Sequence, residues 1–319
     1  MSRDTARLTE DDLQAFDEAA AFEKAPSAGG ASIAEVAKAA EGAPSAGGAK
    51  AAEGAPAAEG APIAEKTLAL TVAYNGAGFH GFARQPGQTT VQGEIENALQ
   101  ILFHHEVETV GAGRTDAGVH ALAQVVSFKL PMGEYEAFSL HKLRNSLNAL
   151  TSDGIVVSKI EEKPEGFSAR FSAVEREYRY RYAVDGTEPL FTRPYVWWVP
   201  LADPLDVHLM RQAASYLVGE HDFASFCLTA SSIDKSTVRE VLSITFFGMN
   251  HFGESCLVLQ IRANAFLHSM VRVIAGSLLE VGTRKREVSW IAEVLAARDR
   301  KAAGQTAPAQ GLTLWRVRY

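Results

Sequence analysis

One short segment, residues 111 to 120, constrains this chain more than any other feature. It reads Gly-Ala-Gly-Arg-Thr-Asp-Ala-Gly-Val-His and is followed by an apolar run that predicts a buried strand. Glycine permits positive φ and close approach of the backbone to a ligand, so a loop with three glycines indicates a binding or catalytic role. The loop presents the carboxylate of Asp116 two residues after the guanidinium of Arg114. A tight turn with a surface ion pair between these two side chains is the simpler alternative.

The first 64 residues differ in composition from the remainder. Residues 25 to 62 are built mainly from Ala, Gly, Pro, Glu and Lys, and the string at 25 to 31 recurs at 43 to 49. Such a low-complexity tract cannot bury enough apolar surface to offset the entropy of ordering. We therefore expect residues 1 to 64 to form a disordered N-terminal extension.

Charge is also divided unevenly along the chain. Residues 1 to 64 carry 5 Lys+Arg and 11 Asp+Glu, which accounts for −6 of the net charge of −7. The rest of the chain, with 26 basic and 27 acidic side chains, is nearly neutral. Because phosphate contacts need only a local cluster of Arg and Lys, this charge neither indicates nor excludes an RNA partner.

Cysteine content and hydropathy set the expected compartment. The two cysteines, Cys227 and Cys256, form no CxxC pair and have no histidines spaced to complete a zinc shell, so we expect a reducing environment and no metal. The N-terminus is rich in acids, and no stretch approaches the roughly 20 apolar residues that span a bilayer. A cytoplasmic protein without a membrane segment is expected.

Hydrophobic periodicity predicts a mixed fold whose body begins near Lys66. Strands are predicted near 66 to 74, 119 to 128, 154 to 160, 176 to 184, 239 to 247, 256 to 263 and from 312 onward. Helices are predicted at 91 to 105, 138 to 150, 204 to 218, 266 to 281 and 287 to 297. Because strands and helices interleave, an α+β or α/β class follows, and the pattern leaves parallel and antiparallel pairing undecided.

Further segments extend the pattern beyond the loop at 111 to 120. They are Tyr74-Asn75-Gly76, Val91-Gln92, Ala169-Arg170-Phe171-Ser172-Ala173, Tyr178-Arg179-Tyr180, and the runs at 219 to 226 and 263 to 272. Together with the loop, which resembles a GRTDxGVHA signature, they resemble the tRNA pseudouridine synthase A family over residues 66 to 319. The chain departs from this pattern at Phe79-His80-Gly81-Phe82, where many members have Tyr-Tyr-Gly-Trp, and at Ala83. We expect these departures to affect contacts with RNA and not the reaction.

The resemblance implies a pseudouridine synthase fold, with two α/β halves, an antiparallel-rich sheet and a central active-site cleft. Residues 66 to 168 are expected to form the half that carries Asp116, and residues 169 to 319 the half that completes the cleft. The implied activity converts uridine to pseudouridine at nucleotides 38, 39 and 40 in the anticodon stem-loop of tRNA. The implied assembly is a homodimer in which one tRNA contacts both subunits. Because substrate and product contain the same atoms, no cofactor is expected.

The resemblance also implies roles for individual residues. Asp116 matches the catalytic carboxylate, Arg272 the arginine that pairs with it, and Tyr178 the tyrosine that stacks on the target uracil. Arg114 is expected to bind the substrate, at a phosphate or in the place of a flipped nucleotide, and Leu312 to line the pocket. From the residues alone, Arg272 also fits a structural salt bridge, and Tyr178 and Leu312 also fit a core. Whether Asp116 attacks C1′ or C6, or removes the C2′ proton, stays open.

Two other classes of function fit parts of the pattern. A hydrolase acting on a glycosidic bond would ordinarily use two carboxylates that flank the bond, and the loop holds one acid. An RNA-binding module without catalysis would leave the RNA unchanged, whereas the hydrolase would release uracil. Mapping pseudouridine in tRNA incubated with the protein separates the three.

Overall fold

The computed structural model describes residues 64 to 228 and 236 to 319. Nearly all of the predicted N-terminal extension lies outside the described residues. The strands are β1 Glu65–Tyr74, β2 Val110–Gly111, β3 His120–Pro131, β4 Ile155–Lys163, β5 Glu175–Ala183, β6 Trp197–Trp198, β7 Gly219–Asp222, β8 Val238–His251, β9 Glu254–Ala263 and β10 Leu312–Arg318. The α-helices are α3 Val91–Phe103, α4 Met132–Ala137, α5 Leu140–Leu150, α6 Val207–Ser215, α7 Met270–Gly282 and α8 Trp290–Ala297.

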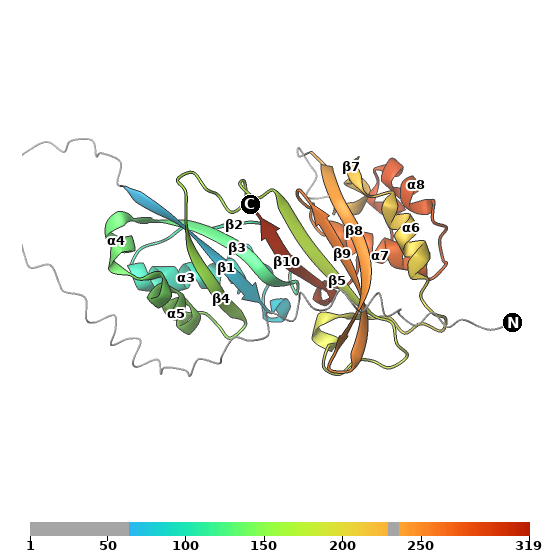
Figure 1. Ribbon diagram of the computed structural model, residues 1–319, viewed down its shortest axis with the longest axis horizontal. Helices are drawn as coiled ribbons and strands as arrows, with labels where there is room; N and C mark the ends of the chain where they lie inside the picture. Colours follow the sequence, from blue (N-terminus) through green and yellow to red (C-terminus); the bar gives the residue numbers. More distant parts are fainter. Residues whose placement is uncertain (1–63, 229–235) are drawn as a thin grey trace, which may run out of the picture.

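The strands of the described residues form one sheet, which is the spine of the molecule (Figure 1). Its order is β4-β1-β3-β10-β5-β9-β8-β7, with β2 paired to β3 and β6 paired to β5. Pairing is antiparallel except between β10 and β3 and between β5 and β6. The last strand, β10, therefore joins the half of the sheet that contains β1, β3 and β4 to the half that contains β5, β8 and β9.

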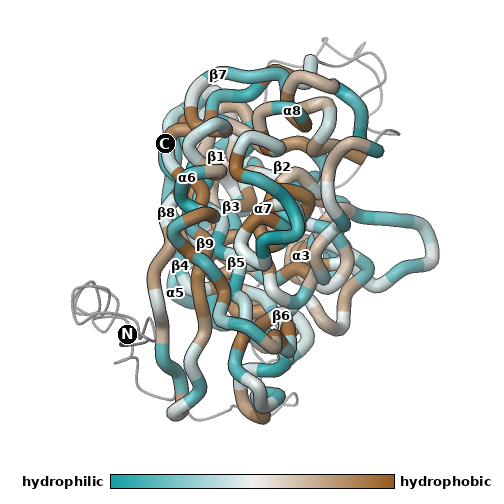
Figure 2. Tube along the Cα trace, turned by 90° about the vertical axis from the view of Figure 1, so that its right-hand side faces the viewer, coloured by the Kyte–Doolittle hydropathy of each residue, from teal (hydrophilic) through white to brown (hydrophobic). Residues whose placement is uncertain are grey.

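The helices cover one face of this sheet. In the first half α5 packs on β4 and α3 packs on α5, and in the second half α6 packs on β8 and α7 packs on β5. A single hydrophobic core includes Leu70 of β1, Leu314 of β10, Tyr182 of β5 and Ile274 of α7. Both groups of helices therefore share one side of the sheet. Hydrophobic segments gather around α7 and the central strands, whereas β7 at the periphery is hydrophilic (Figure 2).

Local sequence explains where α3 begins and ends and why α7 is buried. α3 follows Thr90, whose side chain accepts a hydrogen bond from Gly93 N, and is followed by His104 in a left-handed conformation. α7 is buried along its length apart from Arg272 and Glu280. A helix that is apolar on all sides belongs in a core, so the guanidinium of Arg272 requires a partner there.

The main elements predicted from the sequence are confirmed. Each predicted strand and helix has a counterpart, and the mixed class with an antiparallel-rich sheet is as expected. Periodicity does not predict β2, β6, β7 or α4, because segments of 2 to 6 residues are too short to show a hydrophobic period. Within the described ranges, no helix combines the length and apolarity needed to cross a membrane.

Candidate active site

The loop between β2 and β3 is supported by the segment that follows β1. Tyr74 Oη and Thr115 Oγ1 are 2.8 Å apart, and the Phe82 N–H donates to Thr115 O at 3.1 Å. Gly81 has a φ of +96°, and a Cβ on it would lie 2.9 Å from Thr115 O. Only glycine allows this approach without strain, so the backbone that carries Asp116 rests on a fixed support.

Phe79 and Phe82, where the chain departs from the family pattern, are both buried. The Phe82 ring stacks on Tyr74 with the ring centroids 6.3 Å apart. It also fills the space beside Gly111, where a Cβ would lie 2.3 Å from the ring. The departure at Phe82 therefore changes the packing under the loop, whereas the Phe79 ring lies beside Gly154 and His80 is exposed.

Asp116 meets the start of α7 across the seam. Arg272 Nη1 donates to Asp116 Oδ2 at 2.7 Å, and Ser269 Oγ donates to the same oxygen at 2.6 Å. His268 Nε2 lies 3.3 Å from the other oxygen, Oδ1. The two carboxylate oxygens are therefore not equivalent, because Oδ2 accepts two short bonds and Oδ1 has one longer contact.

Arg272 is fixed on both sides. Its Nε donates to Ala307 O at 2.8 Å while its Nη1 bonds Asp116. The side chains of Arg272 and Asp116 are 18% and 20% exposed, so the pair is shielded from bulk water and still open to a substrate. Charge-assisted bonds and the positive end of α7 both stabilise negative charge on the carboxylate.

Tyr178 of β5 lies near the same carboxylate. It is buried, its ring packs edge-on against Phe266 with centroids 5.0 Å apart, and a Cβ on Gly113 would lie 3.9 Å from its hydroxyl. Burial raises the pKa of Tyr178, and the nearby charge of Asp116 adds to the effect. The phenol therefore keeps its proton at neutral pH.

Tyr180 and Tyr182 share the strand face of Tyr178 and are core residues. Both are fully buried. Tyr180 Oη donates to Pro308 O at 2.9 Å, and Tyr182 Oη donates to Ala275 O at 3.0 Å. Their hydroxyls are therefore satisfied away from the carboxylate.

Of the predicted substrate-binding residues Arg114 and Leu312, the first lies on the surface and the second in the core. Arg114 is exposed, and within the described part of the chain it makes no hydrogen bond or ion pair. The surface ion pair between Arg114 and Asp116 is therefore not formed, because Asp116 pairs with Arg272 instead. Leu312 is buried at the start of β10, opposite Tyr180 in the antiparallel register, where it belongs to the main core.

Arg176 is a residue near the site that the sequence analysis does not single out. Its guanidinium donates to Ala112 O at 3.0 Å, to Arg170 O at 2.6 Å and to Asn264 O at 2.7 Å. It thus ties the loop before Asp116 to segments of the second half. Its position in the sequence could have indicated this role. Residue 176 lies two before Tyr178, so the two side chains share the buried face of the strand.

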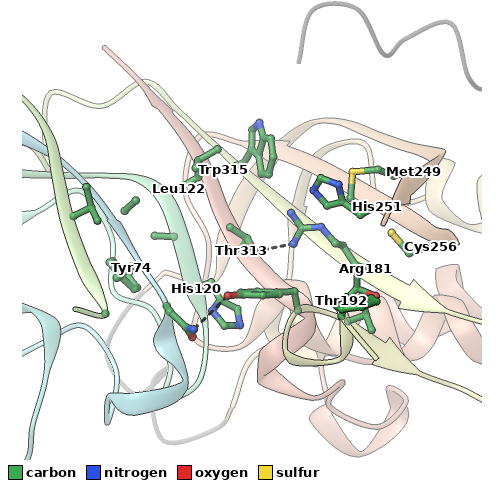
Figure 3. Close-up of a pocket in the computed structure, with 18 of the residues that line it drawn as sticks. Tyr74, His120, Leu122, Arg181, Thr192, Met249, His251, Cys256, Thr313 and Trp315 are labelled. Atoms are coloured by element: carbon green, nitrogen blue, oxygen red, sulfur yellow. Dashed lines mark hydrogen bonds between the residues drawn. The ribbon is translucent and has the colours of Figure 1, made fainter. Parts of the chain in front are cut away.

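The other face of the sheet holds a cavity that is separate from these residues (Figure 3). Its volume is about 520 Å³, and Asp116, Tyr178 and Arg272 do not line it. Leu122 of β3 and Trp315 of β10 form part of its wall. The lining also includes His120, Val156, Arg181, Phe191, Tyr195, Met249, Cys256 and Thr313.

Arg181 and His120 are among the polar side chains that line this cavity. Arg181 Nη1 donates to Thr313 Oγ1 at 2.9 Å. His120 Nδ1 accepts from Gly76 N–H at 3.1 Å, and this requires Nε2 to carry the proton donated to Pro194 O at 3.1 Å. Burial lowers the pKa of His120, so the neutral ring is favoured. Among residues 64 to 228 and 236 to 319, no cluster of three or more His, Cys, Asp or Glu side chains could hold a metal ion.

Comparison with known proteins supplies an independent line of evidence. The family model described as tRNA pseudouridine synthase matches residues 70–172 and 213–319. A tRNA pseudouridine synthase A from Bacillus pumilus is 44% identical over 251 residues, which cover 78% of this chain and 97% of the relative. One from Brevibacillus brevis is 44% identical over 254 residues, covering 80% of this chain and 100% of the relative. A chain of a solved Cbf5-Nop10-Gar1 complex is 13% identical, with a TM-score of 0.28 over 66% of this chain and 45% of the solved chain. This similarity is too low to support a conclusion about fold or function.

Proposed function

The chain belongs to the tRNA pseudouridine synthase family, an isomerase family that acts on uridine in tRNA, and we propose that Asp116 is its essential carboxylate. We further propose that the targets are nucleotides 38, 39 and 40 of the anticodon stem-loop. The observation that carries the proposal is the meeting of Asp116 with Arg272 and Ser269 at the seam. A carboxylate held by two donors and still partly exposed fits a reacting group better than a structural ion pair.

The reaction breaks the bond between N1 and C1′, turns the uracil and joins C1′ to C5. The proton on C5 leaves and N1 gains one, so atoms balance without an added reagent. Asp116 can assist by attacking C1′ or C6, or by removing the proton from C2′, and each route uses a carboxylate in its charged form. The buried ring of Tyr178 supplies a flat surface on which a detached base can stack.

Access to a uridine inside a stem requires that the nucleotide leave the base stack. Arg114, exposed two residues before Asp116, suits a role at a phosphate or in the vacated space. Leu312, buried on the helix side of β10, is the residue that we propose lines the pocket from the second half.

We propose that the working form is a cytoplasmic homodimer whose subunits meet through the sheet face opposite the helices. This face exposes Leu122, Val156 and Phe191 around the cavity shown in Figure 3. Exposed apolar side chains around a cavity are typical of a protein interface. The helices of the described residues cover the other side of the sheet and leave this face open. We propose that a second copy of the chain covers it.

The deciding experiment is to incubate the protein with unmodified tRNA and to map pseudouridine by position. The wild-type protein should form it at nucleotides 38 to 40, and Asp116→Asn should form none while binding tRNA within about 3-fold of wild type, because phosphate contacts dominate binding. Release of free uracil would indicate a hydrolase, and unchanged RNA a binding module. Turnover by Asp116→Asn, with deamidation excluded by mass spectrometry, would remove Asp116 from the mechanism.

A further inference from the structure

Ser269, the residue before α7, has features that its place at a helix start does not explain. Its φ is 57° and its ψ is 10°, a left-handed conformation that costs free energy for a residue other than glycine. A serine in this place ordinarily accepts a hydrogen bond from a backbone N–H of the first turn, but Ser269 makes no such bond. Its hydroxyl instead donates to Asp116 Oδ2 at 2.6 Å.

The consequence lies in how the two donors share one oxygen. Arg272 Nη1 reaches the same Oδ2 at 2.7 Å, so rotation of the carboxylate about its Cβ–Cγ bond would break both interactions. A single donor would leave the carboxylate free to pivot around one contact. Oδ2 is therefore held by two short bonds, whereas Oδ1 has the longer 3.3 Å contact with His268 Nε2 and is the oxygen left for the substrate.

We infer that Ser269 is a positioning residue that, together with Arg272, fixes Asp116 Oδ2 and presents Oδ1 to the uridine. This inference rests on the proposed role of Asp116. It holds for each of the three open routes, because attack on C1′, attack on C6 and removal of the C2′ proton all need one oxygen held in a defined direction. Loss of the Ser269 hydroxyl should therefore slow the chemical step and leave tRNA binding unchanged.

The test variant is Ser269→Gly, which removes the hydroxyl and also relieves the left-handed strain. We expect the single-turnover rate to fall by about 10-fold to 100-fold, with the Kd for tRNA within about 2-fold of wild type. The melting temperature should stay equal or rise, because glycine adopts this backbone without penalty. A purely structural serine would give no such split between rate and stability.

Two matched variants complete the experiment. His104→Gly relieves a nearly identical backbone, with φ 60° and ψ 17°, at the end of α3, and it should leave the rate unchanged. Ser269→Asn restores a donor in a residue that tolerates the left-handed conformation, so it should recover part of the rate lost in Ser269→Gly.

Each result has a definite meaning. A wild-type rate for Ser269→Gly, with Asp116→Asn inactive, would overturn the positioning role and leave the role of Asp116 intact. A weaker Kd or a lower melting temperature that accounts for the rate loss would also overturn it. If Asp116→Asn itself turned over at the wild-type rate, the proposed function of the carboxylate would fail first.

Discussion

The two faces of the sheet at the seam are built from alternate residues of the same strands, yet they differ in chemistry. On the helix side, Tyr178 and the Asp116–Arg272 pair lie together, with 2.7 Å between the charged groups. On the other side, Arg181 donates to the hydroxyl of Thr313 and lies over the Trp315 ring beside a cavity of about 520 Å³. The cavity is therefore not where the charged groups converge. The paired charge at the seam supports the role proposed for Asp116, whereas the volume of the cavity alone assigns no function.

One substitution on each face of the sheet tests whether the two faces differ in function. Arg272→Met removes the guanidinium beside Asp116, and we expect the single-turnover rate to fall by about 10³-fold, the upper scale for loss of one preorganised electrostatic donor. Arg181→Met removes the guanidinium at the cavity and should leave that rate within about 2-fold. Rapid-quench measurement of pseudouridine on unmodified tRNA gives both rates.

Equal rate losses in Arg272→Met and Arg181→Met would show that the two faces do not differ in function. Circular dichroism and melting temperature serve as controls for folding, because each substitution removes a partly buried charge.

A second prediction concerns Tyr178, on the helix side. Tyr178→Phe keeps the ring that can stack on uracil, and we expect it to lower the rate by about 100-fold if the hydroxyl takes part in proton transfer at C5. Because burial raises the pKa of Tyr178, the phenol is protonated at neutral pH. Its oxygen can accept the C5 proton only if it gives up its own proton to another group. A wild-type single-turnover rate would restrict Tyr178 to stacking, and Tyr178→Leu would then be the damaging variant.

A third prediction tests the open face. Leu122→Glu places a charge in the proposed dimer interface, and we expect dimerisation to weaken by about 2 kcal/mol, or roughly 30-fold in Kd. Ile101→Glu is the matched control, because Ile101 is also an exposed apolar residue but lies on α3 on the helix side. Analytical ultracentrifugation measures both. An unchanged Kd for Leu122→Glu would place the interface elsewhere.

The smallest effect is expected from His120 at the cavity. Its folded pKa is lowered by burial, so the unfolded chain binds the proton first as the pH falls. The stability that neutral His120 contributes is present above the unfolded pKa of about 6.5 and is lost as the pH falls through the folded value. The melting temperature should therefore drop more between pH ~7.5 and ~5.5 in wild type than in His120→Gln. Equal drops would show that His120 is not linked to folding.

The pKa of His105 is shifted in the opposite direction from that of His120. The hydrogen bond that its Nε2 donates to the Glu134 carboxylate on the exposed surface raises the pKa of His105, so any stability it contributes is lost as the pH rises. The His105→Gln variant should therefore not reproduce the acid-side behaviour of His120→Gln.

Much of the fold and part of the site could be predicted from local pattern. Alternation and helical spacing placed the main strands and helices, and the loop at 111 to 120 identified Asp116. The predicted need of Arg272 for a carboxylate partner is confirmed by its bond to Asp116. Ser269 and Arg176 were missed, because a serine before a helix and an arginine at a strand start have common structural explanations.

Spacing over a few residues was enough to predict the main strands and helices, their apolar faces and the loop that carries Asp116. The tertiary structure was needed to show that β10 lies between β3 and β5, that the helices share one face and that Ser269 joins Arg272 at Asp116. The bonds from Ser269 and Arg272 to Asp116 cross 153 and 156 positions of sequence. No local periodicity specifies contacts between residues so far apart in sequence. They follow from the packing of both halves of the sheet against a shared core.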